Sequence, residues 1–467
     1  MLHLLVLGFL LAICADAREP LDRPNFVVIL LDDAGYGDFS HTGNPSIHTP
    51  NVTRMANEGL NFPQFYTASP ACSASRYALL TGRSPARSGF GAWVLGTNQP
   101  RYLHPREVTI AEALKRRGYS TAFYGKWHLG NPNEANKFTP DALPLAHGFD
   151  VWEGTNVSND YDPGADLYRN NERIAVNILN KTDIHENLTQ RYGGLGAEFI
   201  RDHANDPFFL YLAPNMPHLP VLASRDFRGR SLRGLYGDVI EELDVMVGQI
   251  INTLEQHGIA KNTLVVFTSD NGPWIRFENT KSHEKYGEAR FLVGSARPFR
   301  DGKGSTWEGG VRVPGVFWWP GVIRPATVVR QPAATFDVMP TVLALAGESL
   351  PTARELDGRD IRGYLNRDLF PQPEPFQFIY TGGPDNRIYG ARQGPWKLHT
   401  RLYSQTGDDY GFMASKKQPL LFNVEVDPSE RIDLADQHPA EVARLKSAID
   451  EFKVSLATDE PFWERSR

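Results

Sequence analysis

The chain has 467 residues, of which 41% are hydrophobic and 22% charged, and its formal net charge is −6. This composition excludes a largely disordered protein, and the small net charge without a basic cluster argues against nucleic acid as a partner. The length allows one large domain and a smaller one.

The N-terminal residues have the pattern of a secretory signal. An apolar stretch from Leu4 to Cys14 precedes Ala15-Asp16-Ala17, which fits a cleavage site. A membrane anchor is the alternative, but this stretch, like every later one, is short of the ~18–20 apolar residues of a membrane span. We expect residues 1–17 to be removed and the mature chain to follow the secretory pathway, to an extracellular or lysosomal site, without a membrane span.

Removal of this signal leaves Cys72 as the one cysteine. A single thiol cannot form an intrachain disulfide, so Cys72 is either a buried bystander or a reactive group. Four N-x-S/T sequons are candidate glycosylation sites of an exported protein: Asn51, Asn156, Asn180 and Asn187. Asn51 and Asn156 stand close to candidate site residues, so we do not expect both to carry glycans.

Apolar runs alternate with helix-like segments through about the first 350 residues. The runs predict strands within 25–33, 119–128, 207–218 and 262–272. Segments 107–118 and 237–258 have apolar residues at helical spacing, and each ends in glycine. This order predicts an α/β domain, residues 18–350, with a large, mostly parallel sheet and helices on both faces.

Each expected strand ends in polar residues. Asp32 and Asp33 follow the first, Lys126 and His128 the second, His218 the third, and Asp270 and Asn271 the fourth. Because ligands bind at the carboxyl ends of strands in open α/β sheets, we expect these side chains to meet in one crevice.

The acidic pairs supply only oxygen ligands, which suits Ca²⁺ or Mg²⁺. Adjacent carboxylates repel each other unless a positive charge neutralises them, although either pair alone is also typical of a solvated turn. Arg76, Lys126, His218 and Lys303 suit a tetrahedral oxyanion such as sulfate or phosphate. Histidines such as His128 suit acid–base chemistry, although a lone histidine is more often a packed, hydrogen-bonded one.

Two further segments bear on this crevice. Lys303 lies in the glycine-rich stretch RDGKGSTWEGG (300–310), which lacks the spacing of a P-loop. Cys72 begins a segment that we expect to be a helix ending at Gly82, and a helix N-terminus favours an anion.

After about residue 350 the pattern changes to short strands and a closing helix at 439–456, which predicts a smaller antiparallel subdomain, residues 351–467. Its expected strands are FQFIYTG, RIYGARQG, PWKLHTR and PLLFNVEVDP.

Six motifs in this order resemble those of one family. CSASRYALLTGR, which starts at Cys72, resembles the sulfatase signature C-x-P-x-R, and GYSTAFYGKWHLG resembles the second signature. LLDDAGYGD, FTSDNGP, GKGSTWEGGVRVP and the closing GPWKLHTR…LLFNVEVDPSERIDLA also match. From about residue 23 to 455, the chain is identified as a member of the type I sulfatases of the alkaline phosphatase superfamily. It is most similar to the arylsulfatase A and N-acetylgalactosamine-6-sulfatase group.

The resemblance implies a sulfuric ester hydrolase with a modified cysteine. During export, a formylglycine-generating enzyme would convert Cys72 to Cα-formylglycine, whose hydrate attacks sulfur and gives a covalent sulfo-enzyme. Aryl sulfates would be substrates in vitro, and a sulfated carbohydrate or glycolipid in nature. The family carries one metal ion, Ca²⁺ with Mg²⁺ as the alternative, which would contact residue 72. Its ligands here would be Asp32, Asp33, Asp270 and Asn271.

The resemblance also implies a role for each remaining site residue. Arg76 and Lys126 would hold the hydrate, and Asp270 would take its proton. His218 and Lys303 would bind sulfate, and His128 would take the proton that allows sulfate to leave. Ser158, in GTNVSND (154–160), would contact the substrate by similarity to a loop of arylsulfatase A-like members.

One position departs from the signature, and two other functions stay open. Ala74 stands where the signature has proline, which restricts the backbone, so conversion of Cys72 could be less efficient.

The alternatives are a phosphodiesterase or phosphonate hydrolase of the same superfamily and a non-catalytic binder of sulfated glycans. Loops 84–106, 154–190 and 273–299 are expected to set specificity, with Arg101 and His104 as candidate sugar contacts or plain surface residues. The sequence leaves the oligomeric state open.

Overall fold

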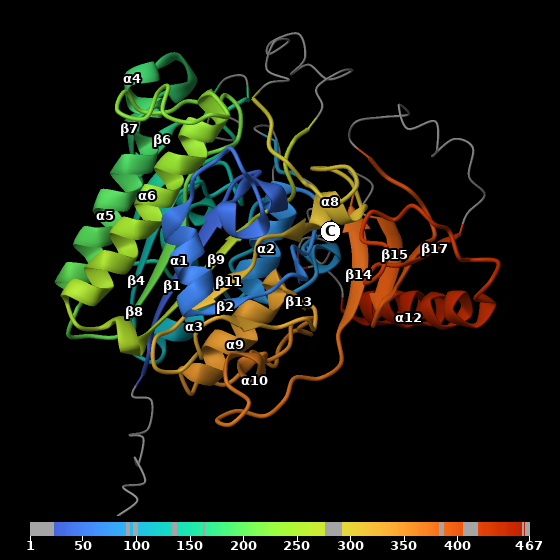
Figure 1. Ribbon diagram of the computed structural model, residues 1–467. Helices are drawn as coiled ribbons and strands as arrows, with labels where there is room; N and C mark the ends of the chain where they lie inside the picture. The colour runs from blue at the N-terminus through green and yellow to red at the C-terminus, as the bar shows by residue number, and fades with distance from the viewer. Residues whose placement is uncertain are drawn as a thin grey trace, which may run out of the picture.

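The structure is a computed structural model that describes residues 23–89, 94–96, 101–132, 138–161, 164–275, 292–382, 387–404, 419–459 and 462. The expected signal, residues 1–17, lies outside the described residues. Figure 1 shows a larger part, in which helices surround a sheet, and a smaller sheet with its own helix at the right of the view.

A ten-stranded sheet forms the centre of the larger part, in the order β12-β2-β11-β9-β1-β8-β4-β5-β6-β7. Its five middle strands are parallel. They are β9 (Thr263–Ser269), β1 (Asn25–Leu31), β8 (Phe208–Ala213), β4 (Ser120–Gly125) and β5 (Val151–Thr155). The four strands expected from the apolar runs are therefore confirmed, and β5 adds a fifth.

The sheet is mixed at both ends. Beside β9, β11 (Val316–Trp318) runs antiparallel to β9 and to β2 (Leu60–Asn61), and β12 (Thr327–Val328) pairs parallel with β2. Beside β5, β6 (Leu167–Arg169) and β7 (Glu172–Ala175) are antiparallel. The prediction of a mostly parallel sheet holds for the centre, whereas the short edge strands make the whole sheet mixed.

Strand β1 explains why helices cover both faces of this sheet. All seven of its residues are buried. Val27, Ile29 and Leu31 belong to one hydrophobic core, and the residues between them belong to another, as the two-residue period of a strand requires. A strand with no polar face needs cover on both sides.

The covering helices divide between these two cores. One core includes α1 (Pro50–Glu58), α5 (Leu188–Asp202) and α6 (Leu235–Gln256); the other includes α2 (Cys72–Thr81), α3 (Ile110–Lys115) and α9 (Val338–Leu345). The expected helix at 237–258 is α6. The one at 107–118 is the shorter α3, whose start is fixed because Thr109 accepts a hydrogen bond from the Glu112 N–H at 3.1 Å.

The smaller part is an antiparallel sheet, as predicted. Its strands β14 (Gln377–Gly382), β15 (Arg387–Gln393), β16 (Trp396–His399) and β17 (Leu420–Asn423) pair in chain order, and α12 (Pro439–Thr458) packs against β15 and β16. The remaining short elements are β3 (Phe65–Tyr66), β10 (Arg312–Val313), β13 (Ala333–Ala334), α4 (Thr182–His185), α8 (Glu308–Val311) and α10 (Arg362–Leu365).

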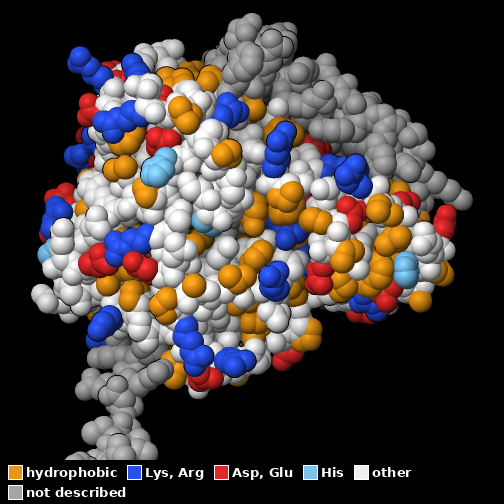
Figure 2. All heavy atoms as spheres, viewed as in Figure 1, with side chains coloured by type: hydrophobic (Ala, Val, Ile, Leu, Met, Phe, Trp, Pro, Cys, Tyr) orange, Lys and Arg blue, Asp and Glu red, His pale blue; other side chains and the backbone are white. Residues whose placement is uncertain are grey.

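On the face seen in Figure 2, acidic and basic side chains are interspersed, which accords with the small net charge. Among the helices that the structure describes, none has both the length and the apolar character needed to cross a bilayer.

Candidate active site

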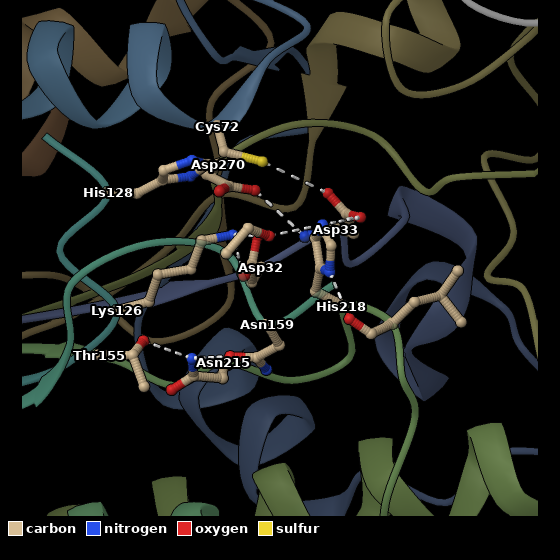
Figure 3. Close-up of polar contacts among 12 residues, drawn as sticks. Asp32, Asp33, Cys72, Lys126, His128, Thr155, Asn159, Asn215, His218 and Asp270 are labelled. Carbon is tan, nitrogen blue, oxygen red and sulfur yellow. Dashed lines mark hydrogen bonds and ion pairs between the residues drawn. The ribbon is translucent and has the colours of Figure 1, made fainter. Parts of the chain in front are cut away.

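Polar side chains from the ends of four central strands meet beside the start of α2. Asp32 and Asp33 follow β1, Lys126 and His128 follow β4, His218 follows β8, and Asp270 follows β9 (Figure 3). Cys72 is the first residue of α2, which ends at Gly82 in the left-handed conformation, as expected. The structure therefore brings together segments that are up to about 240 residues apart, at the edge where ligands bind in α/β sheets.

The acidic groups lie close enough to share one cation. Ligand atoms of Asp32, Asp33, Cys72 and His218 all lie within 4.8 Å of one another, and the four residues are buried. The amide of Asn271 donates to Asp33 Oδ1 at 2.7 Å, and the Asp33 N–H donates to Asp270 Oδ1 at 3.1 Å. The other two predicted ligands, Asp270 and Asn271, thus contact the cluster through Asp33.

Three cationic side chains surround the carboxylates. Lys126 Nζ lies 2.6 Å from Asp32 Oδ2, Lys303 Nζ lies 2.8 Å from Asp33, and Arg76 donates to Asp270 Oδ2 at 2.8 Å. These contacts affect the pKa values of the carboxyl groups. Burial opposes ionisation of Asp32, but Lys126, His218 and Arg76 outweigh it and hold its pKa well below the ordinary value. Burial and the charge of Asp32 raise the pKa of Asp270 to about 7, against the effect of Arg76.

A hard divalent cation fits this donor set. Asp32 Oδ1 and Asn271 Oδ1 are buried and have no hydrogen-bond partner within the described ranges, although Arg76 lies 3.4 Å from Asp32 Oδ1 in an ion pair. Buried polar atoms are nearly always hydrogen-bonded, so two oxygens without a hydrogen bond beside two further carboxylates indicate a ligand. Oxygen donors of this kind are those that Ca²⁺ and Mg²⁺ take.

Cys72 borders the acidic cluster, with Sγ 3.9 Å from Asp33 Oδ1. Burial raises the pKa of its thiol well above the ordinary value, against the effect of Lys126 and Lys303. The unmodified thiol is therefore protonated at neutral pH and is a weak nucleophile. Ala74, the position that departs from the signature, is fully buried in α2.

Two histidines line the same cavity as this thiol. His128 Nε2 lies 3.0 Å from Tyr161 Oη and 3.1 Å from the Leu95 carbonyl, and its Nδ1 is buried without a partner among the described residues. Burial lowers the pKa of both His128 and His218, and nearby lysines add to the effect. His128, whose pKa lies well below the ordinary value, is therefore neutral near pH 7. Ser158 Oγ lies 3.3 Å from His218 Nε2 and from Lys126 Nζ.

A cavity of about 170 Å³ opens beside Cys72. Five of its lining residues were predicted as site residues: Cys72, His128, Ser158, His218 and Lys303. Sequence reasoning missed Asp160, Tyr161 and Trp274, which also line it. Asp160 stands two positions after Ser158 and Trp274 three after Asn271, so closeness to predicted residues is the one signal that could have found them.

The candidate sugar contacts and the glycosylation sequons lie outside this cavity. Arg101 donates to the Gly89 carbonyl and His104 packs against Phe462, and neither lines the cavity beside Cys72. Among the sequons, Asn156 is buried and Asn51 donates to Asp244 at 2.8 Å, whereas Asn180 and Asn187 are exposed.

Comparisons with known proteins cover nearly the whole chain. The sulfatase family profile matches residues 24–348, and a profile for the C-terminal region of aryl-sulfatase matches 372–466. N-acetylgalactosamine-6-sulfatase of Mus musculus is 36% identical, over 98% of this chain and 91% of that protein. Steryl-sulfatase of Homo sapiens is 32% identical, over 88% and 84%. The crystal structure of the PsFucS1 sulfatase from Pseudoalteromonas sp. matches with a TM-score of 0.79 at 26% identity, over 95% and 92%.

Proposed function

The chain belongs to the sulfatase family of sulfuric ester hydrolases, and we propose that it hydrolyses the sulfate ester of a carbohydrate in the cavity beside residue 72. One observation carries this proposal. The buried start of α2 lies beside carboxylates that follow β1 and β9, and beside three cationic side chains: Lys126 after β4, Arg76 on α2 and Lys303 in the glycine-rich loop.

Asp32, Asp33, Asp270 and Asn271 are the proposed ligands of one Ca²⁺ ion, with Mg²⁺ as the alternative. The unpaired oxygens of Asp32 and Asn271 support this assignment. A bound cation would neutralise the carboxylates and polarise an oxygen of the sulfate group. His218 also lies within reach of the same point, and we assign it to the sulfate instead because its Nε2 contacts Ser158 at the cavity wall.

Residue 72 supplies the nucleophile in this proposal. Conversion of Cys72 to Cα-formylglycine, by a formylglycine-generating enzyme in the secretory pathway, would provide a hydrated aldehyde whose hydroxyl attacks sulfur. The raised pKa of the thiol supports a requirement for conversion, because the unmodified side chain is poorly suited to attack.

The surrounding residues hold charge and move protons. Arg76 and Lys126 are fixed by Asp270 and Asp32 and present positive charge beside residue 72. Lys303 and His218 line the cavity, where they would bind the sulfate oxygens, and Ser158 joins them. His128 is neutral and its Nδ1 has no partner in the described part of the chain. It is therefore able to accept the proton of the remaining hydroxyl on residue 72, whose loss expels sulfate and regenerates the aldehyde.

The test combines mass spectrometry with turnover. The tryptic peptide 55–76 of protein made in a eukaryotic export pathway should carry an aldehyde or its hydrate at residue 72. The same protein should hydrolyse 4-nitrophenyl sulfate faster than 4-nitrophenyl phosphate. Cys72→Ala should abolish turnover with an unchanged melting temperature. An unconverted peptide without turnover would support a glycan-binding function, and faster phosphate hydrolysis would support the phosphodiesterase alternative.

A further inference from the structure

Asp160 places a carboxylate in the cavity without a complete set of partners. It lines the same cavity as Lys303, His218 and Cys72, and one side of it interacts with Ser158. Its Oδ1 is buried and has no hydrogen-bond partner in the part of the chain that the structure describes. An unpaired buried acceptor beside a cavity calls for a donor, and the residues that the structure describes supply none.

The position of Asp160 is fixed by the residue before it. Asn215, just beyond β8, donates to Thr155 Oγ1 at 2.7 Å and to Asn159 Oδ1 at 2.8 Å (Figure 3). The amide of Asn159 then contacts His185 Nε2 at 2.9 Å, and all four residues are buried. This network ties the segment that carries Asp160 to the central sheet, so the carboxylate belongs to a built wall of the cavity.

The charge of Asp160 is unusual for a cavity that receives sulfate. Burial opposes its ionisation, but His218, Lys303 and Ser158 outweigh burial and lower its pKa, so the carboxylate is ionised at neutral pH. An anion next to the sulfate-binding residues repels the sulfate group. The sulfate ester itself has no hydrogen-bond donor to offset that repulsion, so the donor has to come from another part of the substrate.

We propose that Asp160 accepts a hydrogen bond from a substrate hydroxyl close to the sulfate ester, and so makes the cavity selective for sulfated sugars. A sugar carries hydroxyl donors near the ester, on the adjacent carbon of a ring sulfate or on C4 of a 6-sulfate, whereas aryl and steryl sulfates lack them. Trp274 and Tyr161 line the same cavity and provide aromatic surface for the sugar ring. This inference deepens the proposed function and rests on it.

The test pairs two substrates with two enzymes. One substrate is the monosulfated sugar that the wild type hydrolyses fastest, from a panel that includes N-acetylgalactosamine 6-sulfate. The other is its deoxy analogue, in which the hydroxyl nearest the ester (at C4 in a 6-sulfate) is replaced by hydrogen. The wild type should prefer the hydroxylated sugar in kcat/KM by about 10- to 100-fold, as expected for a hydrogen bond to a charged group. Asp160→Ala should lose most of that preference.

Two further readouts separate recognition from a structural role. Asp160→Ala and Asp160→Asn should raise kcat/KM for 4-nitrophenyl sulfate and tighten inhibition by inorganic sulfate, because the repulsive charge is gone. A merely structural role would lower activity toward every substrate in parallel. Asp183→Asn, which removes an exposed carboxylate from α4, is the matched control and should change none of these values.

The outcomes distinguish the two proposals. An enzyme that hydrolyses 4-nitrophenyl sulfate but shows no preference for the hydroxylated sugar overturns the role of Asp160 and leaves the sulfatase mechanism standing. Parallel losses on all substrates in Asp160→Ala also overturn it. Absence of turnover on any sulfate ester, with residue 72 unconverted, overturns the proposed function itself.

Discussion

Replacing Lys397 by methionine tests how the smaller sheet is joined to the catalytic part. Lys397 lies on β16, and its Nζ is 2.9 Å from Glu308 Oε1 and 2.9 Å from Glu430 Oε1. All three side chains are fully buried. Glu308 begins α8, within the same glycine-rich stretch as Lys303, and its N–H donates to Glu430 Oε2 at 2.7 Å. Lys397→Met therefore leaves two buried carboxylates side by side without the cation between them.

The expected loss of stability is about 3–5 kcal/mol, the range for removing one partner from a buried ion pair. The loss should also depend on pH. Burial opposes ionisation of Glu308, but Lys397, Arg312 and Arg392 outweigh it and lower its pKa to about 2, below the ordinary value of 4.5. A lowered pKa stabilises the native state above about pH 4.5, and this contribution disappears as the pH falls toward 2.

Without Lys397, the pKa of Glu308 should rise, so the deficit of the variant should be largest near pH 7 and shrink toward pH 4.5. Calorimetric melting at several pH values measures this deficit. Lys453→Met is the control, because Lys453 pairs with Asp450 in the open, with 57% and 71% of the two side chains exposed, and should cost less than about 1 kcal/mol. A Lys397→Met protein that melts with the wild type at pH 7, or whose deficit is the same at both pH values, would refute the reasoning.

Three other predictions concern the metal, one buried acid and two glycines. Chelation should lower both the melting temperature and sulfatase activity, and Ca²⁺ should restore both; an unchanged melting temperature would contradict the proposed metal site. Burial raises the pKa of Asp38 to about 6 from 3.8, against hydrogen bonds from Tyr236 and the Gly35 and Ser295 N–H groups. Asp38 holds a proton more tightly in the native protein than in the unfolded chain. Its contribution to the free energy of unfolding therefore falls by up to about 3 kcal/mol as the pH rises from 4 to 6. Asp38→Asn should therefore weaken the pH dependence of the melting temperature between pH 4 and 6, and an unaltered pH dependence would contradict this prediction. Gly82→Ala should destabilise by about 1–2 kcal/mol because φ is +69° at the end of α2, whereas Gly194→Ala, in open space on α5, should stabilise by about 0.5–1 kcal/mol; equal effects in denaturant titrations would contradict both.

The central strands could be predicted because each has an uninterrupted apolar run and polar residues directly after it. The two-residue strands β2, β3, β10, β12 and β13 could not, because so short a segment has no periodicity. Helix α5 was also missed, since Gly193, Gly194 and Gly196 weaken its helical signal. Two of these glycines serve tertiary packing. A Cβ would lie 2.9 Å from Met246 at Gly193 and 3.1 Å from Ile250 at Gly196, so α5 packs closely against α6.

The residues of the candidate site also fall into those that could be predicted from the sequence and those that could not. Groups directly after strands, such as Asp32, Lys126 and Asp270, could be placed because the position of a strand end follows from the topology. Tyr161 and Trp274 could not, because they lie in loops whose paths depend on tertiary contacts. The hydrogen bonds that fix Asn159 through Asn215 and His185 join three segments that nothing in the sequence pairs.

Unpaired buried oxygens mark two different ligand positions in this site, and their neighbours distinguish them. Asp32 Oδ1 and Asn271 Oδ1 lie among carboxylates, where the missing partner has to be positive and compact, as a divalent cation is. Asp160 Oδ1 lies on the cavity wall beside Lys303 and His218. Asp160 is a single carboxylate that faces the cavity next to Lys303, and the partner that we propose for it is a neutral donor carried by the substrate. Metal binding and sugar recognition should therefore be separable: chelation should lower hydrolysis of every sulfate ester, whereas Asp160→Ala should weaken the preference for the hydroxylated sugar and raise kcat/KM for 4-nitrophenyl sulfate.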